Sequence, residues 1–110
     1  SMTDELDKAV AAKPVTGFFA DNDIIALDCI RALKEHGYRI PDDVSVVGFD
    51  DIPSCQLLEP PMTTTCVPKS FLGAQAMHQL LRLFADPILP PVKVEISTEL
   101  VKRSTVRRLS

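Results

Sequence analysis

The sequence lacks the features that mark membrane proteins, secreted proteins and binders of polyanions. It has no apolar run as long as a membrane span, and no signal peptide is visible. Its three cysteines are an odd number without C-x-x-C spacing, which is typical of reduced thiols in a cytoplasmic protein. The net charge of −3 gives no footprint for nucleic acid. We therefore expect a cytoplasmic protein without a membrane partner.

Motifs for catalysis and for metal binding are also missing. The sequence contains no G-x-S-x-G, no G-x-x-x-x-G-K-[ST] and no G-x-G-x-x-G. His36 and His78 have no second ligand four residues on, and Cys29 and Cys66 fit core patterns. The pair Asp50-Asp51 is a poor acid–base pair, because adjacent side chains at a strand end point in different directions. The sequence predicts a protein that is not an enzyme and uses no metal or cofactor.

The ends of the chain carry two weaker signals. Lys102, Arg103, Arg107 and Arg108 form a basic cluster, which is more often solvated than bound to DNA. Ser1-Met2 resembles the scar of a removed tag, so we expect the chain to begin inside a longer natural protein. A chain of 110 residues forms one domain at most.

The rest of the chain is organised around the stretch Val44–Asp51. Its run of mostly apolar residues predicts a short strand buried on both faces, which ends on Gly48, Phe49 and two carboxylates. Ligands of open α/β sheets bind just beyond the carboxyl ends of the strands. This position favours Asp50 as a ligand residue, with Asp51 facing away and serving the turn. An acidic strand-to-loop turn without a ligand is an equally simple interpretation.

Strands and helices alternate in the remaining sequence, which predicts an α/β fold with a parallel sheet. We expect helices at Asp4–Lys13, Asp23–His36 and Ser70–Ala85, with Ser70 as the N-cap of the last, and a helical turn at Ser54–Leu58. We expect further strands at Val15–Ala20, Met62–Val67, Val92–Ile96 and Leu100–Val106.

The predicted helix Asp23–His36 has two apolar faces. Its core stripe consists of Ala26, Cys29, Ile30 and Leu33. Ile24, Leu27 and Arg31 fall on a different face. Two aliphatic residues and an arginine outside the core stripe suggest contact with a partner, although a single wide apolar face explains them nearly as well.

Several runs resemble the effector-binding domain of LacI/GalR-type transcriptional repressors. The resemblance is carried by Phe19–Leu27 and Gly37–Asp51, and it continues in the same order through Pro60–Thr65, Leu72-Gly73 with Ala76, and Glu99–Thr105. Each run alone is weak, but their order and spacing together are specific. The resemblance covers nearly the whole chain from about Val15.

The resemblance implies a sensor of two lobes, similar to type I periplasmic binding proteins, with a three-layer lobe of parallel sheet flanked by helices. Residues 1–66 would form part of the C-terminal lobe, which is incomplete in this chain. Residues 67–96 would pack on an N-terminal lobe that the chain lacks, and residues 97–110 would return as a strand and tail. A helix-turn-helix domain, also absent from this chain, would bind operator DNA.

The resemblance also assigns residues. Asn22 and Asp50 match positions that hydrogen-bond the effector in sugar- and purine-responsive relatives. A carboxylate and an amide suit a polyol, so a sugar is the expected effector. The expected homodimer surface consists of Ile24, Leu27, Arg31, Ser54, Leu57 and Leu58. Asp28 departs from the family, which commonly has glycine there, and this would change the edge of the interface.

The implied function is regulation of transcription by a two-state equilibrium. A small effector closes the lobes, and the closure shifts the dimer between forms that bind and do not bind the operator. The alternative is a transport-type periplasmic sugar-binding protein with the same fold. A helix-turn-helix upstream of this chain would favour the regulator, and a signal peptide would favour the transport protein.

Overall fold

The computed structural model describes residue 5 and residues 15–109, which divide into two compact units. Unit 1 comprises the chain up to Cys66 together with Glu99 onward, and unit 2 comprises Val67–Thr98. The helix predicted at Asp4–Lys13 lies outside the described residues, apart from Glu5.

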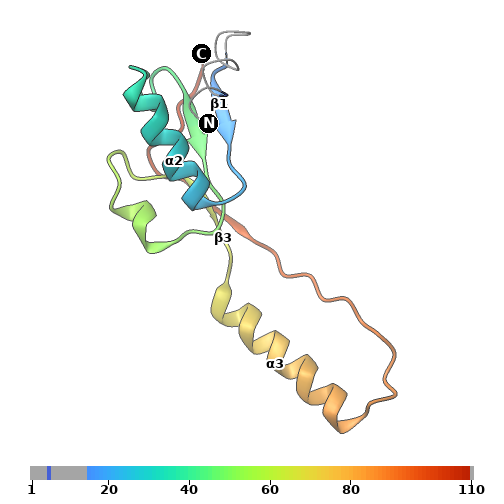
Figure 1. Cartoon of the computed structure of the whole chain (residues 1–110). Helices are drawn as coiled ribbons and strands as arrows, with labels where there is room; N and C mark the ends of the chain where they lie inside the picture. Colours follow the sequence, from blue (N-terminus) through green and yellow to red (C-terminus); the bar gives the residue numbers. More distant parts are fainter. Residues whose placement is uncertain (1–4, 6–14, 110) are drawn as a thin grey trace. The chain divides into compact units, whose positions relative to one another are not determined.

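A parallel strand pair and one helix form the centre of unit 1 (Figure 1). Strand β1 (Gly17–Phe19) pairs with β2 (Ser45–Val47), with Gly17 opposite Ser45. Helix α2 (Asp23–Glu35) connects them and contacts β2. This arrangement is a β-α-β crossover unit, as expected of parallel strands, so the predicted α/β class is confirmed.

Helix α2 matches the predicted helix within one residue. It begins after Asn22, which has extended backbone, and its last turn is followed by Gly37 at φ +85°, a conformation that glycine adopts without strain. The predicted core stripe is buried in full. It packs in a core made of Ala20, Ala26, Cys29, Ile30, Leu33, Ile40, Val44, Val46, Cys55 and Met62.

The prediction that Val15–Ala20 is a buried strand is wrong for one face. Phe18 packs against the core, whereas Phe19 is 69% exposed and Gly17 is also exposed. Side chains of a strand alternate between the two faces, and in the described part of unit 1 the helix α2 serves only the face of Phe18. An apolar run in the sequence therefore did not mean that both faces of the strand are buried.

A second strand pair adds antiparallel structure to unit 1. Strand β3 (Thr64–Cys66) pairs with β4 (Glu99–Val101), with Thr64 opposite Val101. The backbone N–H of Gly48 donates to the carbonyl of Thr63 (3.1 Å), which ties the chain after β2 to the approach to β3. Between them lies the short 3-10 helix η1 (Pro53–Gln56), which begins one residue before the turn predicted at Ser54–Leu58 and ends two residues earlier.

The strand predicted at Leu100–Val106 is shorter than expected and runs antiparallel to its partner. Beyond Val101 the backbone bonds leave the ladder: Arg103 N–H donates to the hydroxyl of Thr63 (2.9 Å), and Ser104 N–H donates to the carbonyl of Pro61 (2.9 Å). Thr105 is fully buried, and its hydroxyl donates to the carbonyl of Val46 (2.6 Å). Side-chain bonds and single backbone bonds thus replace regular strand pairing in this segment.

Unit 2 contains helix α3 (Lys69–Ala85) and an extended segment. Pro68 occupies the N-cap position without a side-chain hydrogen bond, so the predicted N-cap Ser70 lies inside the first turn instead. The strand predicted at Val92–Ile96 is wrong, because residues 86–98 of the described chain form no strand. Alternating apolar residues become a strand only where a neighbour supplies hydrogen bonds.

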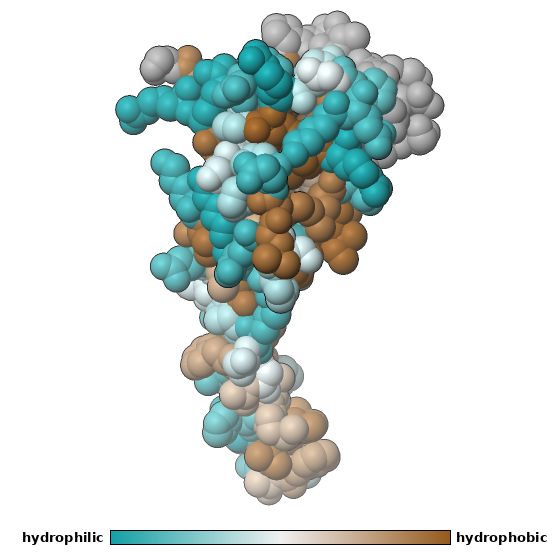
Figure 2. All heavy atoms as spheres, turned by 90° about the vertical axis from the view of Figure 1, so that its left-hand side faces the viewer, coloured by the Kyte–Doolittle hydropathy of each residue, from teal (hydrophilic) through white to brown (hydrophobic). Residues whose placement is uncertain are grey.

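Helix α3 buries none of its residues within the described structure. Figure 2 shows many tan and brown side chains over α3. Its large exposed apolar residues are Phe71, Leu72, Met77, Leu80, Leu81, Leu83 and Phe84. Among the helices that the structure describes, none is long and apolar enough to cross a membrane.

Candidate functional site

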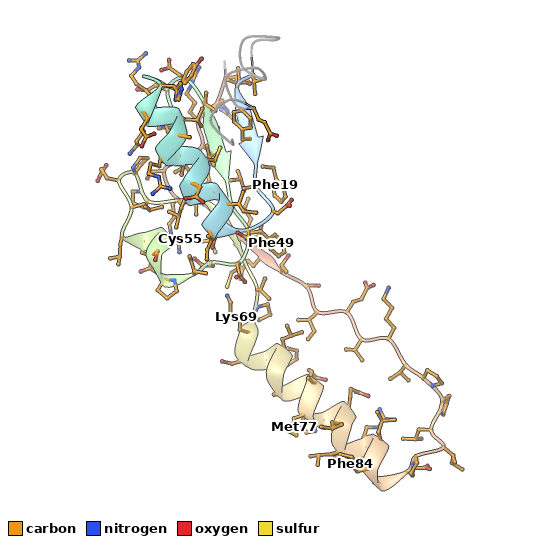
Figure 3. All side chains as sticks on the ribbon, viewed as in Figure 1. Phe19, Phe49, Cys55, Lys69, Met77 and Phe84 are labelled. Carbon is orange, nitrogen blue, oxygen red and sulfur yellow. The ribbon has the colours of Figure 1, made fainter. Side chains whose placement is uncertain are left out.

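The segments that follow β1 and β2 meet at one edge of the parallel pair. Ala20 N–H donates to the carbonyl of Val47 (2.9 Å), and Asp23 N–H donates to the carbonyl of Phe49 (3.0 Å). Figure 3 shows Phe19 and Phe49 at this edge, near the start of α2. Asn22 and Asp50 each lie next to one of the bonded residues. The structure therefore places both predicted ligand residues on the two strand-end segments of this edge.

Asp50 has an unusual and well-fixed backbone. Its φ is +128° and that of Asp51 is +62°, a region that residues other than glycine rarely occupy. Such conformations cost about 1–3 kcal/mol each and cluster at functional sites. Asp50 N–H donates to the carbonyl of Thr65 (2.8 Å), and Asp50 forms a parallel bridge with Cys66. The adjacent strand β3 thus fixes the position from which the Asp50 carboxylate projects.

Asp51 does more than serve the turn. Its carboxylate pairs with the Arg103 guanidinium (Oδ1 to Nη2, 2.8 Å), and both side chains are less than one-fifth exposed, at 18% and 14%. The same guanidinium donates to the carbonyl of Met62 (2.9 Å). Arg103 is therefore not part of a solvated basic tail as predicted, although Lys102, Arg107 and Arg108 are exposed. The pair fastens the C-terminal segment to the strand-end loop.

Asn22 is exposed and acts as the N-cap of α2. Its side-chain oxygen accepts a hydrogen bond from Ile25 N–H (2.9 Å), as an N-cap residue does. The cap uses the oxygen, whereas the amide NH₂ group supplies two donors. The cap role explains Asn22 without a ligand, and it also fixes the side chain at the edge where a ligand would lie.

A buried carboxylate lies beside these residues, and the sequence did not reveal it. Asp23 is fully buried at the start of α2. Its Oδ1 accepts from the hydroxyl of Thr64 (2.6 Å), and its Oδ2 accepts from Ile52 N–H (2.9 Å) and from the Cys55 thiol (3.1 Å). One carboxylate therefore joins the helix, the strand β3 and the segment around η1.

Hydrogen bonding decides the ionisation of this cluster. Burial by itself raises the pKa of Asp23, but the bonds from Thr64, Ile52 and Cys55 outweigh burial and hold the pKa below its ordinary value of 3.8. Burial, followed by the bond to Asp23, raises the pKa of the Cys55 thiol to about 12. Asp23 is thus a carboxylate at neutral pH, and Cys55 is a thiol that donates to it.

The lowered pKa of Asp23 makes stability depend on acid. A carboxyl whose pKa is lower in the folded state stabilises the fold above its unfolded pKa, and this contribution is lost as the pH falls through the folded value. We expect the free energy of unfolding in urea to decrease as the pH falls below about 5. Asp23→Asn should remove much of this loss, and Asp43→Asn, at an exposed surface pair with Arg39, should leave most of it. If wild type and Asp23→Asn lose equal stability in acid, Asp23 is not the group responsible.

The residues predicted for the dimer surface differ in exposure. Ile24 is 63% exposed and Leu57 is 86% exposed. Leu27 is half-buried, and Leu58 is half-buried against the core. Ser54 and Arg31 are exposed, and the Arg31 guanidinium pairs with Asp28 on the same helix (2.8 Å). Asp28 therefore neutralises Arg31 locally.

The described part of the chain offers no cluster of metal ligands. It holds no group of three or more His, Cys, Asp or Glu residues that could bind a metal ion. Cys29, Cys55 and Cys66 are free thiols.

Known proteins identify the family. The sequence profile of the periplasmic binding protein-like domain matches residues 1–106. The PurR transcriptional repressor of Mannheimia succiniciproducens is 40% identical over 95 residues, which are 86% of this chain and 28% of that repressor. The chain thus spans less than a third of the length of this relative.

Solved structures agree with the sequence match. A LacI family regulator from Enterococcus faecalis with bound ribose has a TM-score of 0.85 at 31% identity, over 93% of this chain and 38% of its own. The lac repressor dimer bound to operator and the anti-inducer ONPF has a TM-score of 0.82 at 31% identity, over 94% of this chain and 35% of its own.

These matches define a periplasmic-binding-protein-like domain, and the chain belongs to that family. Within it, the chain is similar to the effector-binding domains of LacI-type transcriptional regulators, as its motifs predicted. The predicted fold is confirmed at the level of the family. The similar proteins named above are regulators of transcription, which does not favour a transport protein.

Proposed function

We propose that this chain is the C-terminal part of the sensor of a LacI-type repressor that binds a small effector at the edge formed by Asn22 and Asp50. The observation that supports it most is Asp50. Asp50 follows strand β2, in which only Val46 is buried; its backbone is fixed by β3, and its φ of +128° is a strained value. Strain that the surroundings maintain is typical of ligand-binding positions.

The chemistry of the edge favours a polyol. A carboxylate accepts two hydroxyl hydrogen bonds, and the Asn22 amide adds two donors. Phe19 is exposed at the same edge and adds an apolar surface, which suits the faces of a sugar ring. The ribose bound to the similar Enterococcus regulator supports this class of ligand. A purine base is the second class that the same donors and acceptors could hold.

Unit 2 supports a sensor of two lobes. An amphipathic helix normally buries one stripe, but α3 exposes Phe71, Met77 and Phe84 and buries no residue within the described chain. Apolar surface of this extent indicates an interaction site. We infer that residues 67–96 pack on a second lobe, and that residues 97–110 return to the first.

The mechanism that we infer is a population shift. The effector, enclosed between two lobes, stabilises the closed form, and the homodimer transmits closure to a helix-turn-helix that binds the operator. The protein would act in the cytoplasm, where its thiols remain reduced, without a metal or cofactor.

The sequence encoded upstream of Val15 tests this proposal against its alternative. We expect a second lobe preceded by a helix-turn-helix. A secretory signal peptide at the start of the protein would instead indicate the transport-type sugar-binding protein, since such proteins are exported.

The dimer surface gives a prediction at Leu57. Because Leu57 is 86% exposed, Leu57→Asp should leave the fold intact but place an unpaired carboxylate in the interface. We expect the dimer dissociation constant to rise by roughly tenfold or more in analytical ultracentrifugation. Leu109→Asp, at an exposed leucine outside the predicted surface, is the matched control and should change little. A wild-type chain that stays monomeric at high micromolar concentration would argue against the surface.

The chain alone should bind sugars and purine bases weakly. Ligand pockets gain affinity by enclosing most of the ligand surface, and a single lobe supplies only one wall. Calorimetry with ribose, lactose and hypoxanthine should therefore give dissociation constants well above the micromolar range. Binding at low micromolar concentration would show that the described residues form a complete pocket.

A further inference from the structure

The carboxylate of Asp23 divides its two oxygens between different parts of unit 1. Oδ1 faces the sheet and accepts from the Thr64 hydroxyl at 2.6 Å. Oδ2 faces the segment before and within η1, where it accepts from Ile52 N–H at 2.9 Å and from the Cys55 thiol at 3.1 Å. The group is fully buried, and each bond replaces solvation that burial removed.

The bonds to Asp23 hold a segment that also packs on the core through Cys55, Ile52 and Leu58. A further backbone bond runs from Met62 N–H to the carbonyl of Cys55 (2.9 Å). The short η1 helix has no side-chain cap, and of its residues only Cys55 is buried. Leu57, directly after it, is 86% exposed. A single-turn helix is unstable by itself, so its position must come from tertiary bonds. Asp23 supplies two of them.

Asp23 also begins α2, next to the cap residue Asn22. We propose that Asp23 is a positioning residue, which holds the η1 segment and the dimer surface at Leu57 against the same helix terminus that presents Asn22 to the effector. This inference rests on the proposed function for the roles of Asn22 and Leu57. The bonds of Asp23 would make the effector edge and the dimer surface move as one body.

Substitutions on the two sides of the carboxylate separate positioning from general stability. Asp23→Ala removes all three bonds. Asp23→Asn keeps most of them, because its oxygen can accept from Ile52 and Cys55 while its NH₂ donates to the Thr64 hydroxyl. Thr64→Val removes only the bond on the sheet side. Cys55→Ala removes one bond on the η1 side, and Cys55→Ser restores a donor.

The experiment measures amide hydrogen exchange and dimer dissociation for each variant of the full chain. For each amide, the readout is the factor by which its exchange accelerates in the variant over wild type. In Asp23→Ala we expect this factor to be at least tenfold larger for Cys55 and Leu57 than for Val46. We also expect the dimer dissociation constant to rise at least tenfold. Asp23→Asn should stay within about threefold of wild type in both readouts. Thr64→Val should lower global stability without a selective change at η1 or in the dimer.

Three results would overturn the proposal. In the first, Asp23→Ala raises exchange equally in η1 and in β2, as a purely structural residue would. In the second, Thr64→Val weakens the dimer as much as Asp23→Ala. In the third, the η1 amides open while the dimer is unchanged. If Asp23→Ala does not fold, the contrast between Cys55→Ala and Cys55→Ser decides in the same way. A monomeric wild type would instead refute the dimer surface of the proposed function, and the exchange contrast would then decide alone whether Asp23 positions η1.

Discussion

Asp50→Ala is expected to weaken effector binding by the complete regulator about a hundredfold or more. If the carboxylate accepts two ligand hydroxyls, the substitution removes two charge-assisted hydrogen bonds worth roughly 1.5–3 kcal/mol each. About 1.4 kcal/mol corresponds to tenfold in affinity. Alanine cannot replace an acceptor, and the Asp50 backbone remains bound to Thr65 through its N–H. Calorimetry of the two proteins with the sugar or purine that the wild type binds measures the effect.

The control for this prediction must be a carboxylate that has no structural partner role. Asp51 is unsuitable, because it pairs with Arg103 in a largely buried position, and its removal would strand a guanidinium. Asp21 is exposed at the same edge, so Asp21→Ala changes the local charge equally. It should leave affinity within a few-fold. Equal losses in both variants, or an unchanged affinity in a folded Asp50→Ala protein, would mean that the site is elsewhere.

The same substitution distinguishes the two modes of regulation. If the effector relieves repression, Asp50→Ala should leave operator binding without effector unchanged, because the hydrogen bonds to the effector exist only when the cleft is filled. If the effector is a corepressor, the variant should lose the DNA binding that depends on effector. An operator-binding assay with and without effector separates the cases.

Gly48→Ala is expected to lower the free energy of unfolding by roughly 2–4 kcal/mol. A methyl group at Gly48 would overlap Oδ1 of Asp23 and would lie 3.2 Å from Cε of Met62, which is also fully buried. Overpacking a core costs about 1–3 kcal/mol, and a hydrogen bond to a charged group contributes about 1.5–3 kcal/mol. The Asp23 carboxylate cannot move aside without weakening its bond from Thr64. Urea unfolding followed by circular dichroism measures the difference.

Gly73→Ala is the matched control for this substitution. Gly73 lies within α3, and an added methyl group would meet no described atom within 4 Å. Alanine is favoured over glycine inside a helix by about 1 kcal/mol, so the variant should be neutral or slightly more stable. If the free energy of unfolding of Gly48→Ala stays within about 1 kcal/mol of the wild-type value, Gly48 is not packed closely against Asp23.

Sequence periodicity predicted the elements that depend on local patterns. The stripe of α2 was found because a buried helix face repeats every three to four residues. Strand bounds were less predictable, since strand length depends on where a partner can supply hydrogen bonds. Val92–Ile96 shows this most clearly, because it alternates like a strand but has no pairing in the described chain. The antiparallel pairing of β4 also depends on a partner 35 residues away in register, Thr65 with Leu100.

The candidate site was predictable only in part, for a related reason. Strand ends and the family resemblance pointed to Asn22 and Asp50, because these lie within continuous motifs. The partners of Asp23 lie 29 to 41 positions away from it in the sequence. Asp51 and Arg103 lie still further apart. Such contacts leave no local periodicity. The one available signal was an acidic residue directly after an N-cap, which also occurs in ordinary exposed helices.

Mapping ligand contacts by nuclear magnetic resonance on the isotope-labelled 110-residue chain tests the central claim most directly. The chain would be titrated with millimolar ribose, lactose and hypoxanthine, a range in which even weak binding moves amide signals. We predict that at least one of these ligands shifts the amides of Asn22, Phe49 and Asp50 together, and that Asp50→Ala abolishes the shifts. Shifts confined to α3 and Leu89–Val92, or none with any of the three ligands, would contradict an effector site at the ends of β1 and β2.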